Sequence, residues 1–220
     1  MIVNYYGHAC FKLKGLNGAV VLDPYSSYVG FDLPNLSADI ITVSHDNPAH
    51  NNSKDISGTT RRNNPFLIDK PGEYEVLGIS VFGVDSSLSA QDTSVKKEKN
   101  FIFTTLVDGL RVCHLGGLNH LLDEKIIAEI GLVDILFLPV GNYQSLNEKD
   151  AIKVARSLEP NIVIPMIYKL PDHDEKVFAD MKPVDDFLKA FEAETQPIDK
   201  LNISRSNLPE EMELIVLNQS

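Results

Sequence analysis

The sequence lacks the features of a membrane or secreted protein. No part of its 220 residues approaches the run of roughly 18 apolar residues that crosses a bilayer. Met1 to Tyr5 carries neither the basic stretch nor the apolar segment of a signal peptide. Only two cysteines are present, Cys10 and Cys113, too few for a disulfide framework and typical of buried thiols in a reducing compartment. We therefore expect a cytoplasmic protein without a membrane span.

Several motifs that carry chemistry are also missing. The chain has no Gly-rich phosphate loop, no Cys-x-x-Cys pair and no Gly-x-Ser-x-Gly elbow. Acidic residues outnumber basic residues by 31 to 20, which gives a formal net charge of -11. A negative field repels polyanions, so we expect no binding to nucleic acid. The one visible basic pair, Arg61-Arg62, is typical of a solvated loop.

The apolar pattern of the first half of the chain is typical of short strands separated by turns. Strands are predicted at Ile2 to Tyr6, Cys10 to Lys14, Ala19 to Leu22, Asp39 to Ser44, Pro65 to Ile68, Gly72 to Val84 (a hairpin that turns near Leu77-Gly78), Phe101 to Val107 and Leu110 to His114. Asp108-Gly109, between the last two, predicts a type I′ turn. The polar segment Ser86 to Asn100 predicts an exposed loop.

Further along, the apolar residues recur with the period of helices. Helices are predicted at Leu122 to Ile130, Glu148 to Leu158 (with Asn147 as N-cap) and Val184 to Glu194, and they alternate with strands at Val133 to Val140, Asn161 to Ile167 and Glu213 to Leu217. Two sheets packed face to face, with helices outside, would bury these elements, so we expect a single α/β domain over residues 1–220. Exposed edges at Phe101 to Val107 and Glu213 to Leu217 would allow a homo-oligomer.

Three histidines follow predicted strands. His45 ends a buried strand, His50 lies five residues later in a polar loop, and His114 ends a strand before a Gly-Gly turn. Loop histidines that make ordinary hydrogen bonds would give the same pattern. If the three imidazoles meet at one sheet edge, they suit zinc, whose catalytic sites use about three protein ligands and an open position.

Several segments together resemble a known family. They are Tyr6-Gly7-His8-Ala9, Val21-Leu22-Asp23-Pro24, Ser44-His45 through His50-Asn51-Asn52, Pro71-Gly72-Glu73-Tyr74-Glu75, Cys113-His114-Leu115-Gly116-Gly117, Asp134 to Gly141 and Pro165-Met166-Ile167-Tyr168. In this order they resemble the metallo-β-lactamase superfamily, in the branch of proposed zinc-dependent hydrolases related to ascorbate-phosphate lactonases. The resemblance covers roughly residues 1–168 and implies a four-layer αββα sandwich.

The resemblance also shows where this sequence departs from the family. The positions that hold one metal in the family are His45, Asn47 and His114, so one imidazole is replaced by an amide. The positions that hold the second metal are Ala49, His50, Gly117 and Ile167, of which three have no ligand atom. Without the two carboxylates, a hydroxide that bridges two metals cannot form. The resemblance therefore predicts a degenerate metal motif without dinuclear hydrolase activity.

These departures predict a residual site and leave its function open. The remaining metal ligands are His45, Asn47, His50 and His114, which we expect to hold at most one zinc ion, weakly. Candidate pocket residues are His8, Asp23, Asp46 and His173. Ordinary buried or loop hydrogen bonds are the more common explanation for His8, Asp46 and His173, and His173 would have to fold back over the strand that ends at Ile167. The resemblance implies that Asp23 forms a hydrogen bond near the His45 loop.

Three functions fit such a site. The first is the binding of a small molecule or a protein partner in a cleft shared with enzymes. The alternative is a mononuclear hydrolase of an ester, lactone or phosphoester, whose metal site is completed by His50 or His173. The third is an interaction subunit whose cleft is filled by side chains, which the apolar Ile167 favours.

Overall fold

The structure is a computed structural model that describes residues 1–88 and 99–220. Most of the loop predicted at Ser86 to Asn100 lies outside the described residues, but its two ends are defined. Ser86 and Asn100 are both buried, and the Ser86 amide donates to the Asn100 carbonyl at 3.0 Å. The Asn100 side-chain amide in turn donates to Ser86 Oγ at 2.9 Å, so the base of this segment is closed.

The first sheet is built mostly from the N-terminal part of the chain. Its strands are β1 (Ile2–Gly7), β2 (Cys10–Lys14), β3 (Ala19–Leu22), β4 (Ile40–Thr42), β5 (Phe66–Ile68) and β12 (Leu201–Asn202), in the order β12-β1-β2-β3-β4-β5. Strands β3, β4 and β5 are parallel. All residues of β3 and β4 are buried, as their continuous apolar runs predict for strands covered on both faces.

The second sheet has seven strands. They are β6 (Gly72–Val76), β7 (Ile79–Asp85), β8 (Phe101–Val107), β9 (Leu110–His114), β10 (Ile135–Pro139), β11 (Ile162–Met166) and β13 (Glu213–Leu214), in the order β13-β11-β10-β9-β8-β7-β6. Asp108 and Gly109 have φ values of 51° and 77°, as a type I′ turn requires. Because β8 pairs with both β7 and β9, the sequence-based prediction of an exposed edge at Phe101 to Val107 is wrong.

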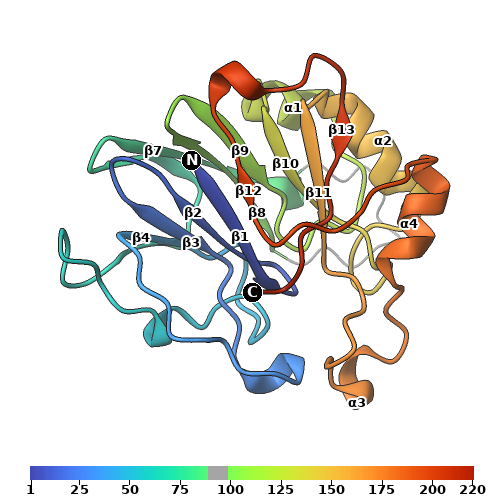
Figure 1. Cartoon of the computed structure of the whole chain (residues 1–220), viewed down its shortest axis with the longest axis horizontal. Coiled ribbons are helices and arrows are strands. Elements are labelled where there is room, and N and C mark those ends of the chain that lie inside the picture. Colours follow the sequence, from blue (N-terminus) through green and yellow to red (C-terminus); the bar gives the residue numbers. More distant parts are fainter. Residues whose placement is uncertain (89–98) are drawn as a thin grey trace.

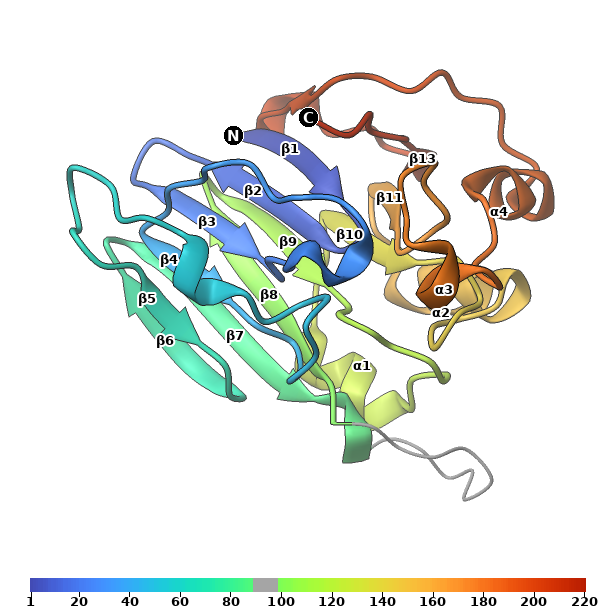
Figure 2. The same cartoon turned by 90° about the horizontal axis from the view of Figure 1, so that it is seen from below.

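The helices are α1 (Glu124–Ile130), α2 (Glu148–Leu158), α3 (Glu175–Phe178) and α4 (Val184–Phe191), and the 3₁₀ turns are η1 (Ser27–Val29), η2 (Ser53–Asp55), η3 (Ser86–Leu88) and η4 (Arg205–Asn207). Helices α1, α2 and α4 lie on the outer side of the seven-stranded sheet, whereas α3 lies apart from them at the loop end of the molecule (Figures 1 and 2). Helix α2 begins at its predicted cap, where Asn147 Oδ1 accepts from the Asp150 amide. No helix in the described part of the chain is long and apolar enough to cross a membrane.

The two sheets face each other across an apolar core (Figure 2). Phe11 of β2 stacks on Phe137 of β10, with ring centroids 3.9 Å apart and ring planes 9° from parallel. Strands β9, β10 and β11 are parallel, so their carboxyl ends lie at one edge of the second sheet. Loops that follow β3 and β4 in the first sheet meet that edge, and polar side chains gather there.

The stack between the sheets gives a test of the core. Replacing Phe11 with Ala removes a fully buried ring, and we expect the free energy of unfolding to fall by about 3–5 kcal/mol, measured by urea denaturation. Leu16→Ala is the control, because that side chain is 81% exposed, and its effect should stay within about 0.5 kcal/mol. Equal losses in the two variants would contradict this account of the core.

Candidate metal site

A small cavity of about 40 Å³ opens where the loops of the two sheets meet. Its lining comprises His8, Tyr28, His45, Asn47, Ala49, His50, Gly117, Tyr143, Gln144, Ile167 and Phe178. These residues come from loops after β1, β4, β9, β10 and β11 and from η1 and α3. The cavity has room for roughly three water-sized groups, so it suits a metal ion with a small ligand.

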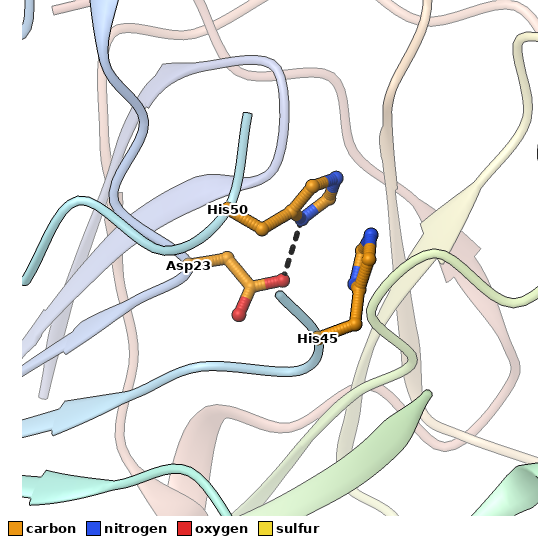
Figure 3. A group of neighbouring side chains, drawn as sticks. All are labelled: Asp23, His45 and His50. Atoms are coloured by element: carbon orange, nitrogen blue, oxygen red, sulfur yellow. Dashed lines mark hydrogen bonds and ion pairs between the residues drawn. The ribbon is translucent and has the colours of Figure 1, made fainter. Parts of the chain in front are cut away.

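Asp23, His45 and His50 form a compact cluster beside this cavity. Their potential ligand atoms lie within 4.8 Å of one another. Asp23 follows β3 and has a φ of 44°, a left-handed conformation that turns its carboxylate back under the histidine loop. Figure 3 shows both imidazole rings with their outer nitrogens side by side and directed away from the Asp23 carboxylate.

Hydrogen bonds fix which nitrogen of each ring carries the proton. Asp23 Oδ2 accepts from His50 Nδ1 at 2.8 Å and from Ser44 Oγ at 2.5 Å. Since the only hydroxyl proton of Ser44 goes to Asp23, Ser44 Oγ accepts from His45 Nδ1 at 2.8 Å. Both rings therefore carry their lone pair on Nε2, which has no hydrogen-bond partner among the described residues. This is the arrangement of metal-binding histidines supported by a carboxylate.

The electrostatics of the cluster keep this arrangement in place. Burial raises the pKa of Asp23, but the adjacent His114 imidazole and the hydrogen bond from His50 outweigh it and bring that pKa to about 2. Burial also lowers the pKa of His45 to about 3. At neutral pH the carboxylate is therefore charged and the His45 ring is neutral, which is the form that binds a metal.

His114 lies next to the cluster, but its ring is used within the protein. Its Nε2 donates to the Ala9 carbonyl at 2.9 Å, and its Nδ1 accepts from the Gly116 amide at 3.1 Å. His114 could bind a metal only by breaking both hydrogen bonds. The prediction that His114 is a ligand is therefore not supported by this geometry, in which it packs in the core against Phe11 and Phe137.

The side chain of Asn47 organises the loop that carries His50. Asn47 Oδ1 accepts from the Ala49 amide at 2.9 Å, and the Asn47 carbonyl accepts from the amides of His50 and Asn51. This is the turn that Asn forms with its own following residues. Asn47 lines the cavity, but the oxygen predicted to bind a metal is used in the turn.

Asp46 does not reach the cavity. Its exposed carboxylate accepts from the side-chain amide of Asn51 at 2.6 Å. The sequence-based placement of Asp46 among the pocket residues is therefore wrong. The alternative, that Asp46 makes an ordinary hydrogen bond within its loop, is what the structure shows. Asp23 is also absent from the cavity lining. It is hydrogen-bonded to Ser44 and His50, in the loop that carries His45, which is the role that the resemblance implies for it.

His8 and His173 form a second histidine pair, which lies next to His50. His173 is buried, and its Nε2 lies 3.4 Å from Nδ1 of His8. The His8 ring also meets the His50 ring edge-on, with centroids 5.1 Å apart. The loop after β11 thus brings His173 against His8, although His173 is not among the residues that line the cavity.

Sequence reasoning missed several residues of the site. Ser44 connects His45 to Asp23, and its place directly before His45 is the only signal that could have indicated it. Tyr28, Tyr143 and Phe178 line the cavity from elements distant in the chain, and no motif marks them. Their proximity depends on the tertiary fold alone.

The fold and the site together define an α/β sandwich with a histidine-rich site at the loop edge of its sheets. The family model described as a Beta-lactamase superfamily domain matches residues 2–167, and the chain belongs to the metallo-β-lactamase superfamily. This confirms the predicted family and fold class.

Relatives and solved structures agree with this assignment. A UPF0173 metal-dependent hydrolase of Archaeoglobus fulgidus is 27% identical, in a match that covers 88% of this chain and 91% of the relative. One of Bacillus subtilis is 24% identical, over 83% of this chain and 93% of the relative. The crystal structure of a proposed Zn-dependent hydrolase of the metallo-β-lactamase superfamily from Thermotoga maritima superposes with a TM-score of 0.78 at 33% identity, over 98% and 97% of the two chains.

The Asp23 network gives a prediction for stability. Asp23→Asn places an amide NH₂ against at least one buried donor of Ser44 or His50, and we expect the metal-free protein to lose about 2–4 kcal/mol in urea denaturation. Asp46→Asn is the matched control, because it changes an exposed carboxylate of the neighbouring loop and should cost less than about 0.5 kcal/mol. An Asp23→Asn protein as stable as the control would show that the network does not stabilise the fold.

The buried histidines predict a dependence of stability on pH. Burial lowers the pKa of His173 to about 4 and that of His45 to about 3, whereas unfolded histidines titrate near about 6.5. The unfolded state therefore takes up protons first as the pH falls, and the free energy of unfolding decreases between about pH 6.5 and 4. Urea midpoints measured in chelator should fall across this window, less steeply in His173→Gln. Identical slopes would contradict the assignment.

Proposed function

We propose that this protein binds one divalent transition-metal ion through Nε2 of His45 and Nε2 of His50 and uses it to hold a small ligand in the cavity. The observation that carries this proposal is the pair of unpartnered Nε2 lone pairs, both set by the Asp23 network. Imidazole nitrogen suits zinc, copper, iron and nickel, so the donor set fits such an ion without selecting one.

Two protein ligands imply weak binding and open positions. A four-coordinate ion held by two imidazoles has two sites left for water or an external ligand. When bound, such an ion supplies a Lewis acid that polarises a carbonyl or phosphoryl oxygen. The chain's own contribution is to fix both ring tautomers and to limit the ligand to the size of the cavity.

The same geometry argues against a dinuclear centre. Ala49, Gly117 and Ile167 offer no ligand atom at the positions where the resemblance places the second metal's ligands. A Cβ added at Gly117 would lie 2.9 Å from Cε1 of His45, so a carboxylate at this position requires His45 to move. We therefore propose that the chain does not form the hydroxide that bridges two metals.

A mononuclear hydrolase is the second candidate. The relatives named metal-dependent hydrolases favour it, and so do the open metal positions. An ester, lactone or phosphoester could place its oxygen on the ion. Attack by water would then need a base from this chain. The carboxylate of Asp23, beside the site, already accepts hydrogen bonds from Ser44 and His50 and does not face the cavity. This shortage of a base makes binding the function that we favour.

The proposal is tested by measuring metal content. Protein purified without added metal or chelator is dialysed against zinc and then against buffer, and zinc is measured by elemental analysis. We expect up to one equivalent in wild type and a loss of at least tenfold in affinity in His45→Ala and His50→Ala, because each removes one of two ligands. His120→Ala is the control, since His120 does not line the cavity.

Other results would change the assignment. Two equivalents of zinc in wild type would contradict the mononuclear site. Loss of zinc in His114→Gln with the fold intact would return His114 to the ligand set. Metal-dependent turnover of a generic ester, lactone or phosphoester that is lost in His45→Ala would favour the hydrolase, whereas stoichiometric metal without turnover would favour binding.

A further inference from the structure

The geometry points to His8 as a hydrogen-bond donor for a small oxyanion in the cavity, with His173 as the residue that positions it. This inference rests on the proposed metal site and adds the chemical class of the ligand. The oxyanion would place one oxygen on the metal held by His45 and His50 and accept a hydrogen bond at another oxygen from Nε2 of His8.

A chain of hydrogen bonds assigns the proton of the His8 ring. The Leu170 amide donates to Nδ1 of His173 at 2.9 Å, so the proton of the neutral His173 ring is on Nε2. That nitrogen faces Nδ1 of His8 at 3.4 Å, a long contact in which Nδ1 of His8 is the acceptor. The proton of the His8 ring is then on Nε2, which has no hydrogen-bond partner among the described residues.

The His8 ring belongs to the cavity. His8 is 2% exposed and lines the cavity beside His50, whose ring it meets edge-on. Its Nε2–H has no protein partner among the described residues, so a ligand or water in the cavity can accept from it. The His8 ring therefore presents one unused donor to a space that the two metal-binding nitrogens also face.

The backbone around His8 holds the ring in place. His8 has a φ of 52°, and its carbonyl accepts from the Tyr5 hydroxyl at 3.0 Å and from the Ile167 amide at 2.8 Å. The ring packs against Phe178 with centroids 5.3 Å apart. The donor is thus oriented before any ligand arrives, which reduces the entropic cost of binding.

The loop that carries His173 is docked on η1. The Asp174 amide donates to the Val29 carbonyl at 3.0 Å. Gly30, with a φ of 108°, allows this close approach, because a Cβ there would lie 2.3 Å from the Asp174 nitrogen. The position of His173, and through it the tautomer of His8, is therefore fixed by packing between two loops.

Charge selects the class of ligand. None of the residues that line the cavity is Asp, Glu, Lys or Arg, and the nearest charge is the Asp23 carboxylate behind the rings. A divalent ion beside that carboxylate leaves one net positive charge, which favours an anionic ligand over a neutral one. Tyr28 and Gln144 are the exposed lining residues, so a longer molecule would pass them toward solvent.

The test measures anion affinity and metal affinity on the same variants. Inorganic phosphate and acetate are titrated into zinc-loaded wild type, His8→Asn and His173→Phe by calorimetry, and zinc affinity is measured separately. Asn is chosen at position 8 because it tolerates positive φ but is too short to replace Nε2. The two anions distinguish a tetrahedral from a planar ligand.

We expect His8→Asn to bind the preferred anion roughly 10- to 100-fold more weakly, with zinc affinity unchanged within twofold. His173→Phe should weaken anion binding less than His8→Asn does. In the nitrogen NMR spectrum it should convert His8 from a single tautomer to a mixture, and His173→Gln should restore part of the affinity. A purely structural role for His173 would not change the tautomer.

The remaining outcomes contradict the inference in distinguishable ways. If zinc-loaded His8→Asn binds both anions as wild type does, or if wild type binds zinc but neither anion, the role of His8 is wrong and the metal site stands. If wild type binds no zinc, the proposed metal site fails, and the oxyanion site fails with it because its second anchor is absent.

Discussion

Asp23 is a completely buried carboxylate on which the arrangement of the site depends. A buried charge is tolerated only where its oxygens accept enough hydrogen bonds, and here the Ser44 amide, the Ser44 hydroxyl and His50 Nδ1 supply them. The same three bonds connect β3 to the loop after β4. One desolvated charge thus aligns two strands of the first sheet and decides which nitrogen each histidine offers to the cavity.

The backbone has a positive φ at several non-glycine positions around the cavity. His8, Asp23 and Ile167 have φ values of 52°, 44° and 52°. Positive φ is especially uncommon for a β-branched residue such as Ile167, and such positions cost of order 1–3 kcal/mol each. Each is held by a hydrogen bond to a neighbouring strand or loop. Strained backbone of this kind clusters at binding sites, which agrees with the proposal of a ligand site at this cavity.

The fold was predictable because its signals are local and repeated. The buried runs of β3, β4, β10 and β11, the Asp108-Gly109 turn and the Asn147 cap each follow from a few adjacent residues. The site was predictable only in part. His45 and His50 follow from a motif, whereas the orientation of His114 depends on Ala9 and Gly116, and the burial of His173 depends on η1. Such contacts between distant segments leave no trace in the spacing of residues.

The space beside the His45 ring restricts which residue can stand at position 117. A Cβ added at Gly117 would lie 2.9 Å from Cε1 of His45, and the 2.8 Å hydrogen bond between Ser44 Oγ and His45 Nδ1 resists movement of that ring. A carboxylate introduced at position 117 would therefore displace His45 before it could itself act as a ligand. Positions 44, 45 and 117 are thus energetically coupled, and the effects of substitutions among them will not add.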